Sequence, residues 1–152
     1  MNKSTAAIFF VDRSLGKRQV AVALSSVGAI VEIHDDHFAT DALDTEWLPE
    51  VARRNWIILT KDEKIADRTL EQVAIAQSDA RVFVLVSGNL SGLEMGQAFG
   101  KALTAMERFV EKHPSPFMAK VYKSGEVKAW KGRDQLLDYL KQQLPPQNGK
   151  SE

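Results

Sequence analysis

The chain contains no cysteine among its 152 residues, which excludes disulfide bonds, thiolate metal sites and cysteine nucleophiles. This absence is compatible with a reducing cytosol. An excess of charge of either sign is also missing, because 20 lysine and arginine residues balance 20 aspartate and glutamate residues. No global field therefore attracts the protein to nucleic acid or to a membrane, and such binding would need a local basic patch.

Long apolar runs are absent as well. None approaches the ~20 residues that a membrane-spanning helix needs, and the first residues, MNKSTAA, are too polar and too short for a signal peptide. The histidines His34, His37 and His113 show no compact zinc-binding spacing. We therefore expect a cytoplasmic protein without a membrane partner. The 44% of hydrophobic residues is enough for one globular domain with a substantial core.

Apolar runs that predict strands alternate with helical patterns over most of the chain. Strands are predicted at 6–11, 29–33, 56–60 and 81–86, and helices at 17–27, 45–54 and 91–112. The first strand, AIFFV, lacks polar alternation, which is typical of a strand buried on both faces. The alternation of strand and helix favours βα units, and therefore an α/β fold with a mainly parallel sheet.

The pattern changes after the segment HPSPF, which breaks the chain. FMAKVYKSGEVKAW alternates like two strands joined across Ser124-Gly125, and 133–143 predicts a short last helix. We interpret 117–143 as a β-hairpin and helix added to a core of about 6–112, within a single domain 1–143. Residues 144–152 are expected to form a disordered tail.

Acidic residues occur where the predicted strands end and the predicted helices begin. These residues are Asp12 after the first strand, Asp35 and Asp36 after the second, Asp44 and Glu46 at the next helix start, and Asp62 after the third strand. Because parallel strands end at one edge of a sheet, we expect Asp12, Asp36 and Asp62 to share that edge. Clustered carboxylates repel one another unless cations neutralise them, and their hard oxygens suit Mg²⁺ or Mn²⁺.

Each of these acidic residues also has an ordinary structural explanation. An aspartate after a strand is often a turn residue, Asp44 is suited to an N-cap, and Glu46 would favour the helix dipole in any case. Asp62 could cap the segment 63–67. The convergence of several strand ends, rather than any single residue, is therefore the basis for predicting a site.

Two stretches of the chain carry a resemblance to a known family. FFVDRSLGKRQVAVALSSVGAIVEIHDD and DTEWLPEVARRNWIILTKD contain a hydrophobic strand ending in Asp, a helix, a second strand, an acidic helix start and a strand ending in Thr-x-Asp. The segment from Ile8 to Ile65 thus resembles the PIN-like domains, in particular the branch of the VapC toxins and the Mut7-C and DUF5615 groups. RVFVLVSGNLSGLEM extends the resemblance as a fourth strand and helix. It implies a three-layer α/β/α fold.

The resemblance also implies a Mg²⁺- or Mn²⁺-dependent nuclease that acts on RNA, often as the toxin of a toxin–antitoxin pair. By motif position it makes Asp12 and Asp62 catalytic metal ligands and places Asp44 or Glu46 at the third acidic position, where Glu46 is taken as the catalytic residue. The full set of metal-ligand candidates is Asp12, Asp36, Asp44, Glu46 and Asp62, and the choice between Asp44 and Glu46 stays open. The expected partners are an RNA substrate and a cognate antitoxin, and a homodimer is left open.

One position departs from the family pattern. Many PIN enzymes carry an acidic residue after the fourth strand, where this chain has SGNLSG, with Asn89 and no carboxylate. Either Asp36 compensates or the site holds one metal rather than two. The departure keeps a second hypothesis open, in which the chain is a catalytically weak or inactive PIN-like module that binds RNA or a protein partner.

Basic residues are interleaved with the acidic ones and are candidates for binding RNA phosphates. Arg13, Lys17 and Arg18 flank Asp12, and Lys61 and Lys64 flank Asp62. Ser14 and Asn89 complete the predicted substrate-binding set. A solvated helix face is the ordinary alternative for each of these charges.

Other phosphate chemistries fit the sequence less well. A haloacid-dehalogenase-like phosphatase needs a second aspartate two residues after the first, where this chain has Ser14. A phospho-receiver domain needs an acidic pair after its first strand and a lysine after its fifth, and the order here does not fit.

Overall fold

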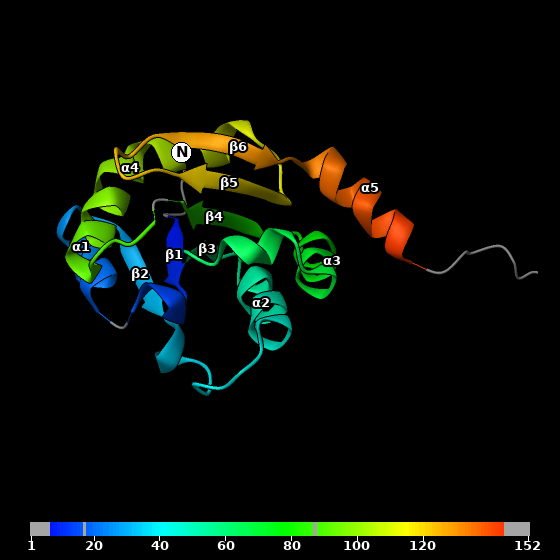
Figure 1. Ribbon diagram of the computed structural model, residues 1–152, viewed down its shortest axis with the longest axis horizontal. Coiled ribbons are helices and arrows are strands. Elements are labelled where there is room, and N and C mark those ends of the chain that lie inside the picture. Colours follow the sequence, from blue (N-terminus) through cyan, green and yellow to red (C-terminus); the bar gives the residue numbers. More distant parts are fainter. Residues whose placement is uncertain (1–6, 17, 87, 145–152) are drawn as a thin grey trace, which may run out of the picture.

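The computed structural model describes residues 7–16, 18–86 and 88–144 (Figure 1). The strands are β1 (Ile8–Val11), β2 (Ile30–Ile33), β3 (Ile57–Thr60), β4 (Arg81–Leu85), β5 (Phe117–Val121) and β6 (Val127–Lys131). The helices are α1 (Gln19–Ser26), α2 (Asp44–Arg53), α3 (Thr69–Ser78), α4 (Gly92–Lys112) and α5 (Arg133–Gln143). Three short 3₁₀ turns, η1 (Arg13–Leu15), η2 (His34–Asp36) and η3 (Glu63–Ala66), follow β1, β2 and β3.

The six strands form one sheet in the order β2-β1-β3-β4-β5-β6. All neighbouring strands are parallel except β5 and β6, which form an antiparallel hairpin. The hairpin therefore extends the central sheet, because β5 pairs with β4. The order also places β1 beside β3, with Val11 opposite Leu59, so the residues that follow these two strands emerge side by side.

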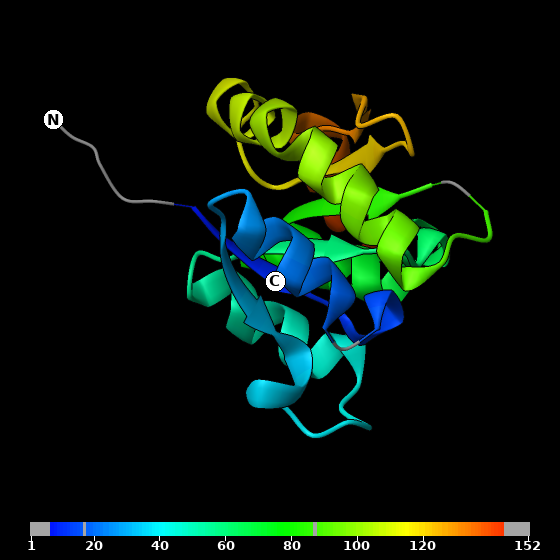
Figure 2. The ribbon, with the colours of Figure 1, turned by 90° about the vertical axis from the view of Figure 1, so that its left-hand side faces the viewer.

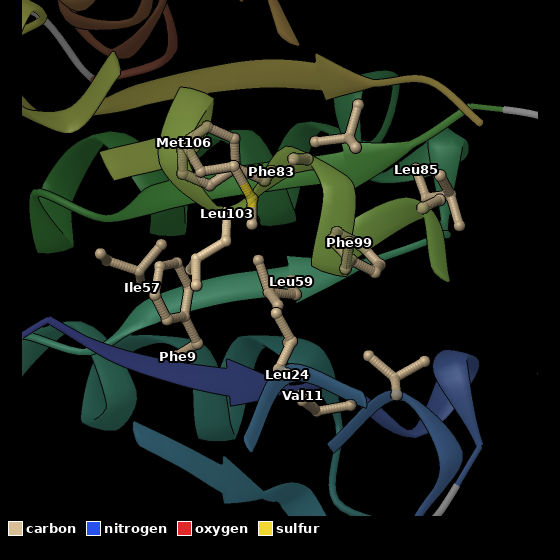
Figure 3. Packing of buried hydrophobic residues seen from close by; sticks show 14 of the residues in the cluster. Phe9, Val11, Leu24, Ile57, Leu59, Phe83, Leu85, Phe99, Leu103 and Met106 are labelled. Carbon is tan, nitrogen blue, oxygen red and sulfur yellow. The ribbon is translucent and has the colours of Figure 1, made fainter. Parts of the chain in front are cut away.

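Helices cover both faces of the sheet, which gives three layers (Figures 1 and 2). Phe9 and Val11 of β1 belong to a hydrophobic cluster with residues of α1 and α4, which Figure 3 shows. Phe10, between them, packs on the other face, in a cluster that includes Trp47 of α2 and Leu136 of α5. The first strand is apolar throughout because each of its faces is covered by helices.

Helices α1 and α4 approach each other closely where α4 carries small residues. A Cβ atom at Gly96 would lie 2.8 Å from Cβ of Ala23 and 3.1 Å from the carbonyl oxygen of Gln19. The small-residue face of α4 therefore packs against α1 of the same chain, because a larger side chain at Gly96 would overlap α1.

The predicted α/β/α fold with its mainly parallel sheet and C-terminal hairpin and helix is confirmed, with element ends shifted by one or two residues. The sequence analysis did not delimit α3. Its buried positions include Gln72, Ala74 and Ala76, which produce a weak apolar period. The predicted tail lies outside the described residues apart from Leu144. No helix in the described parts of the chain has the length and hydropathy that a membrane crossing requires.

Candidate functional site

The ends of β1 and β3 bring Asp12 and the segment Thr60–Asp62 to the same edge of the sheet. The backbone N–H of Asp12 donates to the carbonyl of Leu59 at 3.0 Å, which extends the pairing of the strands by one residue. The Asp12 side chain is 8% exposed, and Thr60 is 1% exposed. A nearly buried carboxylate needs hydrogen-bond donors, so its partners define the site.

Two hydroxyl groups hold the Asp12 carboxylate. Ser14 Oγ and Thr60 Oγ1 each donate to Asp12 Oδ2 at 2.8 Å, and the two hydroxyl oxygens lie 3.0 Å apart. The backbone N–H groups of Lys61 and Asp62 in turn donate to Ser14 Oγ and Thr60 Oγ1, both at 3.1 Å. Within the described ranges, the other Asp12 oxygen, Oδ1, accepts no hydrogen bond. Asp12 is therefore fixed in orientation and has an oxygen available to a ligand.

Asp44 is the first residue of α2 and contributes a second carboxylate. Its Oδ1 accepts a hydrogen bond of 3.1 Å from the indole Nε1 of Trp47. Burial raises the pKa of the Asp44 carboxyl, and the negative charge of Asp12 raises this pKa further, against the effect of the Trp47 hydrogen bond. Asp44 and Asp12 are thus close enough to repel each other.

Asp62 contributes a third carboxylate and caps η3. Its Oδ1 accepts the backbone N–H of Lys64 at 3.1 Å, which is the ordinary structural role considered for it above, and its Oδ2 lies 2.8 Å from Nη1 of Arg68. The same guanidinium nitrogen lies 3.6 Å from Oε2 of Glu71 and 3.9 Å from Oδ2 of Asp44. Arg68 therefore bridges carboxylates that belong to three different segments.

Asp12, Asp44 and Asp62 line one cavity of about 220 Å³, together with Arg13, Ser14 and His34. Carboxylate oxygens are the donors that Mg²⁺ and Mn²⁺ prefer, and the mutual repulsion of these groups favours a bound cation, so the chemistry of the lining suits such an ion. In the described ranges, no three acidic or histidine side chains are close enough as they stand to hold a metal ion. The cation that contacts Asp62 and Asp44 is the guanidinium of Arg68.

Residues 7–87, which include β1, β3 and all three of these aspartates, match the family described as PIN like domain. The chain belongs to the PIN-like domain family. It is also 28% identical over 123 residues to VapC45 of Mycobacterium tuberculosis, a protein whose name classes it provisionally as a ribonuclease. That match covers 78% of this chain and 88% of VapC45. No solved structure matches the chain at comparable significance.

Two acidic candidates, Glu46 and Asp36, are not among the residues that line this cavity. Glu46 turns back along its helix, and its Oε1 accepts the backbone N–H of Leu43 at 2.8 Å. The N-cap position is therefore Leu43, not Asp44, and Glu46 closes the start of α2. Asp36 is exposed in η2 and is not among the residues that line the cavity.

The predicted phosphate-binding residues of the PIN-like domain differ in their surroundings. Arg13 lines the cavity, pairs with Asp35 at 3.0 Å and donates to the carbonyl of Thr40 at 2.9 Å. Arg18, Lys61 and Lys64 are exposed. Asn89 is exposed after β4, away from the lining of the cavity, and Lys17 lies outside the described residues.

Sequence reasoning missed Arg68 and Glu71, which lie at the start of α3. Neither residue carries a motif, and an arginine before a helix followed by a glutamate in its first turn has an ordinary structural explanation. Their proximity to Asp44 depends on the packing of α3 beside α2, which no local pattern reveals. A predicted boundary for α3 would have placed both residues at a helix start, and it is the one sequence signal that could have pointed to them.

Proposed function

We propose that this chain is a Mg²⁺- or Mn²⁺-dependent endoribonuclease, and that it acts in the cytoplasm as the toxin of a toxin–antitoxin pair. One observation supports the proposal above others: in a PIN-like domain, Asp12, Asp44 and Asp62 come from three separate segments and line one cavity. Similarity to VapC45, a protein named as a provisional ribonuclease, supports the same assignment.

Asp12, Asp44 and Asp62 would hold the ion in this proposal. Asp44 is chosen over Glu46 because Glu46 is used to cap α2. Asp36 is not included because it lies outside the cavity lining. A bound divalent ion supplies charge neutralisation at a scissile phosphate and lowers the pKa of water.

The chain's own residues supply orientation and positive charge. Ser14 and Thr60 hold the Asp12 carboxylate through Oδ2, which leaves Oδ1 for a ligand. Arg13, whose side chain is 45% exposed, is the cation among the lining residues that is best placed to contact an RNA phosphate. Lys61 and Lys64 extend the positive charge along the exposed edge and would attract the RNA backbone without reading its sequence.

An RNA-cleavage assay with added Mg²⁺ or Mn²⁺ tests the function. The parent should cut RNA in the presence of metal, and chelation should abolish the activity. Asp12→Asn, Asp44→Asn and Asp62→Asn should each lose it, whereas Asp36→Asn should not. Equal activity in the parent and the three cavity variants would reject the proposed site.

A binding module without catalysis is the second candidate, and one contact favours it. The carboxylate of Asp62 is already neutralised by Arg68 at 2.8 Å, and Asn89 replaces an acidic residue after β4. Titration with Mn²⁺ followed by thermal unfolding separates the two candidates. A metal-dependent rise in melting temperature favours the enzyme, and RNA binding with no response to millimolar metal favours the module.

A further inference from the structure

Arg68 lies at the point where the acidic side chains of the site converge. Its Nη1 atom is 2.8 Å from Asp62, 3.6 Å from Glu71 and 3.9 Å from Asp44. Asp62 and Asp44 line the cavity described above, whereas Glu71 lines a neighbouring hollow that shares Asp44 with it. The guanidinium thus contacts carboxylates of both hollows.

Among the described residues, Arg68 is the cation that balances the negative charges of Asp62 and Asp44. Asp62 has one side-chain partner of positive charge, Arg68, and Asp44 receives only a neutral indole N–H besides it, within the described ranges. Three carboxylates at this spacing repel one another, and a cation among them removes that repulsion. Arg68 therefore supplies part of the charge neutralisation that a bound dication would supply.

The side chain of Arg68 is partly exposed and is not held in place by packing. It is 43% exposed, its ion pairs are all made through Nη1, and no described contact packs the guanidinium against an aromatic ring. Because the guanidinium is partly exposed, water screens each of these ion pairs and can replace it. The Oδ1 atoms of Asp62 and Asp44 already accept N–H groups, so the Oδ2 atoms that Arg68 contacts are the carboxylate oxygens left for a divalent ion.

We propose that Arg68 is an internal counter-cation whose bridge to Asp62, Asp44 and Glu71 excludes a divalent ion from these carboxylates. This inference rests on the proposed function, because it takes Asp44 and Asp62 to be metal ligands. Metal loading then requires the guanidinium to swing out of the site. Arg68 lowers metal affinity and at the same time stabilises the metal-free protein.

Mn²⁺ affinity, measured by calorimetry without RNA, tests this role. Arg68→Gln should bind Mn²⁺ roughly tenfold more tightly than the parent, because a positive charge about 3–4 Å from the ligand oxygens is removed. Arg68→Lys keeps the charge and should stay near the parent. Arg53→Gln is the matched control, since Arg53 is an exposed arginine that pairs with Glu50 on α2 away from the cavity. It should leave the affinity unchanged.

The metal-free protein provides a second measurement. Without metal, Arg68→Gln should melt at a lower temperature than Arg53→Gln, and saturating Mn²⁺ should remove this difference. In nuclear magnetic resonance spectra, the guanidinium signals of Arg68 should shift on addition of Mg²⁺ as the bridge to Asp62 breaks.

The outcomes distinguish this inference from the proposed function. If parent and Arg68→Gln bind Mn²⁺ equally, or if Arg68→Gln binds it more weakly, the counter-cation role is refuted while the metal site stands. If neither protein binds Mn²⁺, both proposals are refuted. Arg68→Lys behaving like Arg68→Gln would also refute the role, because charge would then not be the cause.

Discussion

The hydroxyl of Thr60, at the end of β3, donates a 2.8 Å hydrogen bond to the carboxylate of Asp12, at the end of β1. The same hydroxyl oxygen accepts the backbone N–H of Asp62 at 3.1 Å. One buried side chain therefore sets the orientation of one proposed metal ligand and the backbone position of another. Thr60 belongs to the Thr-x-Asp element, and this contact gives the threonine of that element a physical role as a positioning residue.

Replacing Thr60 by valine should weaken metal binding. Thr60→Val keeps the shape of the side chain but leaves Asp12 and the Asp62 N–H each without one partner. We expect Mn²⁺ affinity to fall by about 10- to 100-fold and the free energy of unfolding to fall by about 1–3 kcal/mol. Calorimetry and urea unfolding measure the two effects. Thr60→Ser restores the hydroxyl and should recover the affinity; a valine variant that binds like the parent would contradict the positioning role.

Asp12→Asn should affect catalysis far more than stability. The amide retains an oxygen that accepts from Ser14 and Thr60, but it removes the negative charge offered to a cation. We expect RNA cleavage to fall by about 100-fold or more, as for other groups that stabilise charge in an active site. Asp36→Asn removes an exposed carboxylate outside the cavity and should cleave at the parent rate. A cleavage rate close to that of the parent in Asp12→Asn would be incompatible with the site.

Asp44 should make the metal-free protein less stable at neutral pH. Burial and Asp12 raise the pKa of Asp44 in the folded state, so the folded protein binds this proton more tightly than the unfolded chain does. The free energy of unfolding therefore decreases as the pH rises from the pKa of Asp44 in the unfolded chain through its higher pKa in the folded protein. Above both pKa values the whole destabilisation by the Asp44 charge is present.

Asp44→Asn removes that cost and keeps an oxygen that can accept from Trp47. Without metal, the variant should melt at a higher temperature than the parent at pH 7, and the difference should shrink towards about pH 4, near the ordinary pKa of aspartate. Asp41→Asn, at an exposed position in the preceding loop, should leave the melting temperature unchanged. A destabilised Asp44→Asn at neutral pH would contradict this account.

Two glycines of α4 should respond to alanine in opposite directions. At Gly96 the new methyl group would meet Ala23 at 2.8 Å, so Gly96→Ala should lower the free energy of unfolding by about 1–3 kcal/mol. A methyl group at Gly100 meets no atom within 4 Å apart from the backbone of its own helix turn and its chain neighbours, and alanine there should raise stability by about 0.5–1 kcal/mol through its helix propensity. Chemical unfolding of both variants checks the pair, and a neutral Gly96→Ala would show that the helices separate easily.

Much of the fold followed from patterns within short windows of residues. The apolar run at β1, the helical spacing before Gly28 and the alternation on either side of Ser124-Gly125 each specify an element locally, and all three are present. The alternation of strands and helices implies parallel strands, and parallel strands necessarily end at one edge. Asp12 and Asp62 could be assigned to the same edge for that reason.

The membership of the cavity could not be derived in this way. Glu46 and Asp44 are two residues apart and chemically similar, yet one caps α2 and the other lines the cavity, because the direction of each side chain depends on its position around the helix. Arg68 and Glu71 lie near Asp44 because α3 packs beside α2, a tertiary contact between two helices that β3 and η3 separate in the chain. Periodicity and spacing act over a few residues and fix which elements form, whereas the groups that meet in a cavity depend on strand order and helix packing, which are properties of the folded chain.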